Sequence, residues 1–172
     1  MLQLLVAPLS SLEDVISTHA PSHLVSLLSP EHMIETPTGF DASRHLKLGV
    51  NDIVDPAAGT APPARSHVDA LLAFSRDWNG DGPLLIHCWA GISRSMASAF
   101  TILCDRLGPG REIEIARAMR QRAPHAQPNR LLVSHADEAL ERGGKMLAAL
   151  DAMGPALLVE EGVTTVFPLV GL

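Results

Sequence analysis

The stretch from His87 to Ser95 reads HCWAGISRS and carries residue types suited to chemistry on a bound anion. Cys88 is a strong nucleophile as a thiolate, and Arg94 offers a planar fork of N–H groups that matches two oxygens of an oxyanion. A buried strand precedes these residues and a helix follows, so the backbone N–H groups between them converge at a helix N-terminus. The pattern predicts a thiolate placed beneath a bound phosphate and aimed at phosphorus.

Strands and helices are predicted to alternate around this loop. Apolar runs predict strands over residues 2–7, 23–28, 45–50 and 84–87. Apolar residues at helical spacing predict helices over residues 66–78, 93–107, 112–121 and 129–142, with a shorter helix after Ser10 or Ser11 and a long Pro-containing loop over 51–63. This order predicts an α/β fold with three layers (α/β/α), a four-stranded mainly parallel sheet, and the anion-binding loop between the last core strand and a helix.

The length of 172 residues predicts a single domain with a hydrophobic core of its own. We expect the core to span about residues 1–145. Residues 146–172 are expected to form a C-terminal extension that packs on this core. A β-branched cluster around residues 163–166 belongs to the extension, but the sequence assigns it no position.

Composition excludes several functional classes. The net charge of −6 argues against nucleic acid or an anionic membrane as the partner. No apolar run is long enough to span a bilayer, and no secretory signal is recognised. With only two cysteines a disulfide scaffold is excluded, so a cytoplasmic location is expected. No metal site is expected, because Pro21 interrupts the helix that would pair His19 with His23.

The motif HCWAGISRS resembles the signature loop of the cysteine-based protein tyrosine phosphatases, which reads HC, five residues, then Arg and Ser or Thr. The wider resemblance is to a small dual-specificity-like, bacterial-type branch and covers about residues 2–142. Asn129, which follows Pro128, is similar to a Pro-Asn pair of that branch. The resemblance implies a parallel core sheet flanked by helices and a reaction that needs no cofactor.

The resemblance also implies a role for each residue of the motif. Cys88 is the nucleophile that forms a phosphocysteine, and His87 orients it. Ser95 hydrogen-bonds the sulfur and helps it to leave. Arg94 clamps the phosphoryl oxygens and, with the backbone around it, completes the substrate-binding set: Trp89, Ala90, Gly91, Ile92, Ser93 and Arg94.

An aspartic acid on a preceding loop protonates the leaving oxygen in that family. Asp52 is favoured over Asp55 because it lies closer to the end of the predicted strand over residues 45–50, where its position is better fixed. The sequence lacks the Trp-Pro-Asp motif of the tyrosine-specific subfamily. Trp89 has two interpretations, stacking on a substrate ring or packing beside the loop, and packing is the commoner role.

The predicted function is a phosphomonoester hydrolase, a protein tyrosine or dual-specificity phosphatase. Its substrate would be a phosphorylated protein or a small aryl phosphate. Inositol polyphosphates are disfavoured, because the loop has no Lys or Arg between Cys88 and Arg94 to bind further phosphates. One alternative is a rhodanese-like sulfurtransferase or an arsenate reductase, in which a cysteine loop also holds an anion. Another is a catalytically silent phosphoprotein-binding module, against which the pairing of Cys88 with Arg94 argues.

Overall fold

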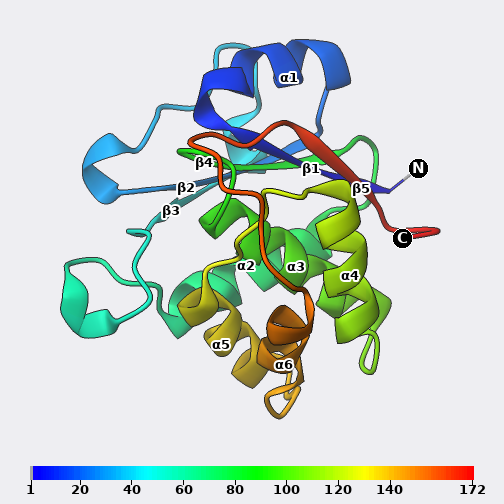
Figure 1. The fold of residues 1–172 in the computed structure, drawn as a ribbon. Coiled ribbons are helices and arrows are strands. Elements are labelled where there is room, and N and C mark those ends of the chain that lie inside the picture. The colour runs from blue at the N-terminus through cyan, green and yellow to red at the C-terminus, as the bar shows by residue number, and fades with distance from the viewer. Residues whose placement is uncertain (1) are drawn as a thin grey trace.

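One mixed sheet forms the centre of the computed structural model, which describes residues 2–172 (Figure 1). Its strands lie in the order β3-β2-β4-β1-β5. The four strands β1 (Gln3–Pro8), β2 (His23–Leu28), β3 (His45–Gly49) and β4 (Leu84–Cys88) pair in parallel. All five residues of β4 are buried, as expected for a strand covered on both faces. The predicted α/β class and parallel core are confirmed.

Helices cover the two faces of the sheet unequally (Figure 1). Only α1 (Leu12–His19) lies on one face, where Leu12 and Val15 pack against Leu5 and Leu85. The other face holds the larger core and the remaining helices: α2 (Arg65–Asp77), α3 (Arg94–Leu107), α4 (Glu112–Arg122), α5 (Arg130–Ala139) and α6 (Lys145–Ala152). None of the helices of residues 2–172 is both long and apolar enough to cross a bilayer.

The predicted count of four strands was wrong by one. β5 (Thr165–Pro168) adds a fifth strand, which pairs antiparallel with β1 and buries Phe167 in the main core. The sequence marks this segment only by a few β-branched residues. Its partner lies at the opposite end of the chain, so no turn or local periodicity could reveal the pairing.

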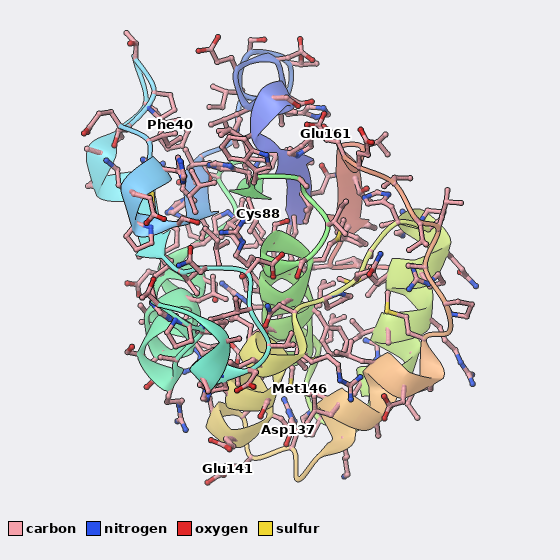
Figure 2. The ribbon with its side chains drawn as sticks, turned by 60° about the vertical axis from the view of Figure 1, so that its left-hand side comes forward. Phe40, Cys88, Asp137, Glu141, Met146 and Glu161 are labelled. Atoms are coloured by element: carbon pink, nitrogen blue, oxygen red, sulfur yellow. The ribbon has the colours of Figure 1, made fainter. Side chains whose placement is uncertain are left out.

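Helix α6 was not predicted, because its cap comes from the preceding helix. Both carboxylate oxygens of Asp137, on α5, accept backbone hydrogen bonds at the start of α6, from Gly144 at 2.6 Å and Met146 at 2.8 Å. Figure 2 shows Asp137 beside Met146 at this turn. A cap seven or nine residues upstream is not part of a local capping pattern.

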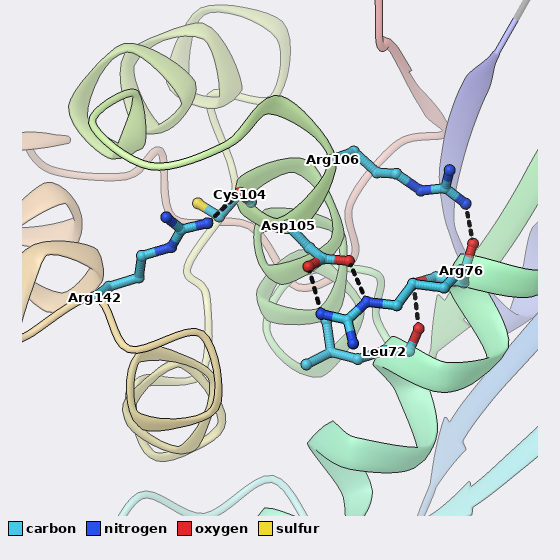
Figure 3. Close-up of polar contacts among 7 residues, drawn as sticks. Leu72, Arg76, Cys104, Asp105, Arg106 and Arg142 are labelled. Atoms are coloured by element: carbon cyan, nitrogen blue, oxygen red, sulfur yellow. Dashed lines mark hydrogen bonds and ion pairs between the residues drawn. The ribbon is translucent and has the colours of Figure 1, made fainter.

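Helix α3, which begins at the end of the predicted anion-binding loop, is braced against α2. Arg76 of α2 donates to both oxygens of Asp105 on α3, at 2.9 and 2.7 Å (Figure 3). Arg106 donates to the carbonyl oxygens of Ser75 and Trp78 at the end of α2. These charged contacts fix the far end of α3 and leave its N-terminus to face the loop.

Candidate active site

Cys88 and Arg94 meet at the carboxyl end of the central strand. Cys88 is the last residue of β4 and Arg94 the first of α3, so residues 89–93 form the loop that joins them. Figure 2 shows Cys88 directly above the first turn of α3. The Cys88 side chain is 2% exposed, and it lies with Arg94 in the lining of a cavity of about 870 Å³. The two predicted residues are therefore brought to one site.

The loop is held from outside through its carbonyl oxygens. Four of the five carbonyl oxygens of residues 89–93 accept hydrogen bonds from backbone N–H groups outside the loop. These bonds run to Trp89 from Leu9, to Ala90 from Gly162, to Ile92 from Gln127, and to Ser93 from both Ala97 and Asn129. In a planar peptide the N–H group points away from the carbonyl. The N–H groups of the loop are therefore turned toward its inner side, which is the arrangement of an anion-binding nest.

Gly91 is required in this loop by conformation and by space. Its φ of +69° lies in the left-handed region, which side chains disfavour. A Cβ at this position would also lie 2.7 Å from the backbone nitrogen of Pro8, at the end of β1. The loop can therefore pass close to β1 only with a glycine here.

Arg94 is a buried cation without a counter-ion. It is 7% exposed, and its Nη1 donates to the Val50 carbonyl oxygen at 2.8 Å. Its Nε has no hydrogen-bond partner, and Arg94 enters none of the ion pairs formed within residues 2–172. A buried charge is costly unless an opposite charge compensates it. The site is therefore suited to an anion that reaches Arg94 through the cavity.

Ser95 contacts the sulfur, as predicted. Its Oγ lies 3.1 Å from the Sγ of Cys88, and both side chains are buried. A hydroxyl at this distance can donate a hydrogen bond to a thiolate and lower the cost of burying its charge. The second cysteine, Cys104, lies fully buried on α3, where burial raises the pKa of its thiol. Its burial in the main apolar core is typical of a structural cysteine.

Asp52 reaches the cavity and Asp55 does not line it. One carboxylate oxygen of Asp52 accepts from Ser93 Oγ at 2.7 Å and from Asn129 Nδ2 at 2.8 Å. The Asn129 side chain also caps α5 by accepting from the Leu132 backbone at 3.0 Å. Asp55 instead accepts from the Ala57 backbone in its own loop. Asn129 thus ties the Asp52 loop to α5 and to residues 89–93, which we call the signature loop after the motif to which they belong.

His87 faces away from Cys88, because neighbouring residues on a strand point to opposite faces of the sheet. Its Nε2 lies 2.6 Å from Ser26 Oγ, which is also 2.8 Å from His45 Nε2, and His45 Nδ1 lies 2.9 Å from Thr36 Oγ1. The Ser26 hydroxyl has one hydrogen, so it donates to one imidazole and accepts from the other. Sequence analysis missed Ser26 and His45, and only their positions inside predicted strands marked them as polar residues in a buried sheet.

The cavity has walls that the sequence did not predict. Val54 follows Asp52 on one side, and the segment over residues 153–156 with Leu158 forms the other. Trp89 is 58% exposed at the rim, where its ring meets the edge of His32 at 6.0 Å between centroids. Trp89 is thus in contact with both the cavity and a neighbouring residue. No cluster of three or more His, Cys, Asp or Glu side chains in the described part of the chain is arranged to hold a metal ion.

Solved structures with a fold similar to that of this chain include phosphatases. No family model and no curated protein matches it. The structure of DUSP15 superimposes with a TM-score of 0.60 at 19% identity, over 87% of this chain and 91% of that one. The Yvh1 phosphatase domain from Chaetomium thermophilum gives 0.56 at 21% identity, over 82% and 92%. PTPMT1 in complex with PI(5)P gives 0.56 at 13% identity, over 83% and 89%. The chain therefore has the fold of the cysteine-based protein tyrosine phosphatases, as the resemblance implied.

The buried histidines should make stability depend on pH. Burial lowers the pKa of His45 to about 4, helped by the charge of Lys47. Burial likewise lowers the pKa of His87 to about 4, although a hydrogen bond with the backbone of Cys88 acts to raise it. A histidine in an unfolded chain titrates near 6.5, so between these values only the unfolded chain binds the protons. The free energy of unfolding should therefore fall as the pH falls from about 6.5 to about 4.

Urea unfolding at about pH 7 and about pH 5 measures this dependence. His45→Gln removes one of the histidines with a lowered pKa and should make the difference between the two pH values smaller. A wild-type free energy of unfolding that is equal at both pH values would contradict the account.

Proposed function

We propose that the chain is a phosphomonoester hydrolase that works through a phosphocysteine, as a protein tyrosine or dual-specificity phosphatase of the small, bacterial-type kind. The observation that carries the proposal is the buried, uncompensated Arg94 beside the buried sulfur of Cys88. A phosphate dianion in the cavity would pair with the guanidinium of Arg94 and accept hydrogen bonds from the backbone N–H groups of residues 89–93. Its phosphorus would then lie within reach of the thiolate.

In the first step the Cys88 thiolate attacks phosphorus. The S–P bond forms while the P–O bond to the leaving group breaks, and the leaving oxygen takes the proton of the Asp52 carboxyl group. Arg94 and the loop N–H groups hold the three remaining phosphoryl oxygens as their charge grows. His87, held by Ser26, keeps the end of β4 in place beneath the loop.

In the second step water hydrolyses the phosphocysteine. The Asp52 carboxylate removes a proton from the water as its oxygen bonds to phosphorus. The S–P bond breaks, and the hydroxyl of Ser95 donates a hydrogen bond to the departing thiolate. The positive charge that the reaction needs comes from Arg94 and the loop backbone, so no metal ion or cofactor is required.

An aryl phosphate, above all phosphotyrosine in a protein, is the substrate class we propose. The phenol leaves more readily than an alkyl hydroxyl, because its pKa is near 10. The loop offers Trp89 and Ile92 beside the phosphate site and carries no Lys or Arg before Arg94. PTPMT1 was solved with the inositol lipid PI(5)P, whereas this loop has no cation for a further phosphate. A cytoplasmic location fits the need for a reduced Cys88.

Substitution of the nucleophile tests the proposal. Wild-type protein should release phosphate from p-nitrophenyl phosphate in the presence of EDTA, and Cys88→Ser should abolish this turnover while it keeps binding of phosphate. Cys104→Ala, which changes the buried cysteine of α3, should retain turnover and serves as the control. Sulfur transfer from thiosulfate to cyanide by the wild type, without phosphate release, would support the sulfurtransferase instead. Phosphopeptide binding without any turnover would support the silent module.

Paired carboxylate variants test the general acid. Asp52→Asn should lower kcat on phosphotyrosine peptides by roughly 10²-fold or more, because the leaving oxygen then lacks its proton donor. The loss should be smaller for aryl esters whose leaving group is already acidic. Asp55→Asn is the matched control on the same loop and should keep kcat close to wild type. A large loss for Asp55→Asn with little change for Asp52→Asn would reverse the assignment.

A further inference from the structure

The segment over residues 153–162, which we call the C-terminal wall, is fixed against the signature loop. Gly162 donates its backbone N–H to the Ala90 carbonyl oxygen at 2.8 Å, and Leu157 donates to Pro124 at 2.8 Å. Arg120 donates to the carbonyl oxygen of Gly154 at 3.2 Å. The wall is therefore anchored at its beginning, middle and end, and its last anchor is a residue of the loop that surrounds Cys88.

Gly162 lets the wall come this close to the loop. A Cβ at this position would lie 2.6 Å from the ring of His125 and 3.1 Å from the carbonyl oxygen of Gly91. Any side chain here would have to displace the imidazole, which is buried, or the wall itself. The close contact thus sets the position of the wall relative to the loop over residues 89–93.

The cavity between the wall and the Asp52 loop is much larger than a phosphate needs. Its volume of about 870 Å³ is within the range of pockets that bury a whole drug-sized ligand. Three exposed apolar side chains come together in its lining from three different segments: Val54, Trp89 and Leu158. Single exposed apolar residues are ordinary, but three around one cavity form an apolar rim.

Two further basic side chains, Arg120 and Arg130, line this cavity. Arg120 donates to the carbonyl oxygens of Pro124 and Gly154, at 2.6 and 3.2 Å. Arg130 is paired with Asp151 at 2.8 Å. The Nε of Arg120 has no hydrogen-bond partner. The rim formed by Val54, Trp89 and Leu158 is itself uncharged, so an apolar group would cover it without displacing any of these contacts.

We infer that the C-terminal wall determines substrate specificity, and that Leu158 binds an apolar side chain next to the phosphorylated residue of a peptide. The inference rests on the proposed function for its phosphate site and adds the part of the substrate beyond the phosphate. Leu158 is 82% exposed, so burying it beneath such a side chain removes apolar surface of both partners from water. A flank of leucine or phenylalanine is therefore favoured over glycine.

Leu157 supplies a matched control for Leu158. It is the neighbouring residue of the wall, has the same side chain and is 62% exposed, but it does not line the cavity. A serine at either position removes the same apolar group from the surface. Only the change at Leu158 removes it from the proposed subsite.

The experiment compares two phosphotyrosine peptides, one flanked by leucines and one by glycines. Their Kd values are measured by calorimetry with the Cys88→Ser protein, which reads the subsite without turnover. Leucine flanks should bind roughly tenfold more tightly, as expected for an apolar contact of this size. Adding Leu158→Ser should reduce this ratio to roughly twofold, while adding Leu157→Ser should leave it unchanged.

Three results would overturn the inference. The first is equal binding of the two peptides, and the second is an equal loss of the ratio in both wall variants. The third is binding of the protein to phosphatidylcholine vesicles that both Leu158→Ser and Leu157→Ser weaken. The rim would then contact a membrane instead of a peptide. Absence of turnover in the wild type would refute the proposed function alone, since the binding ratio still reports on the wall.

Discussion

The hydrogen bonds on the outer side of the signature loop are the interaction on which the site depends. Each carbonyl that accepts a bond from Leu9, Gly162, Gln127 or Asn129 turns the adjoining N–H group inward. The donors come from three separate parts of the chain, so the shape of the loop depends on contacts with distant segments. Arg94 contributes a buried charge without a counter-ion to the same point, which is why we propose an anion there.

The alternation of side chains along β4 separates Cys88 from the residues that support it. Cys88 faces α3 and the cavity, while His87 faces the opposite side of the sheet and joins the hydrogen bonds of Ser26 and His45. The sulfur is thus positioned from its own side by Ser95 and from beneath by a buried polar network. Ser26 joins both imidazoles in this network and so supports the end of the strand, while the Nδ1 of His87 has no hydrogen-bond partner.

Much of this site could be predicted from the sequence because its signals are local. Cys88, Gly91, Arg94 and Ser95 lie within one short stretch, where a buried strand changes into a helix. The parallel core followed from apolar runs, each readable by itself. Asp52 was preferred to Asp55 for its place near a strand end, and the contacts of Asp52 with Ser93 and Asn129 support that preference.

The parts that escaped prediction depend on contacts between distant segments. β5 needs β1 as its partner, and α6 needs Asp137 of the preceding helix as its cap. A polar residue is accommodated at the buried position of Ser26 because two imidazoles from neighbouring strands meet at its hydroxyl. The C-terminal wall is recognisable only where Gly162 meets Ala90, because the sequence predicts that residues 146–172 pack on the core but gives them no position.

The central claim is that the sulfur of Cys88 carries the phosphoryl group between the attack on the substrate and the hydrolysis by water. Wild-type protein is mixed with an aryl phosphate, quenched rapidly in denaturant during turnover, digested, and analysed by mass spectrometry. The account predicts one phosphoryl group on the peptide that contains Cys88, attached to sulfur, and none on that peptide from Cys88→Ser protein. A protein that turns over substrate with no phosphorylated cysteine, or with the phosphoryl group on another residue, would contradict it.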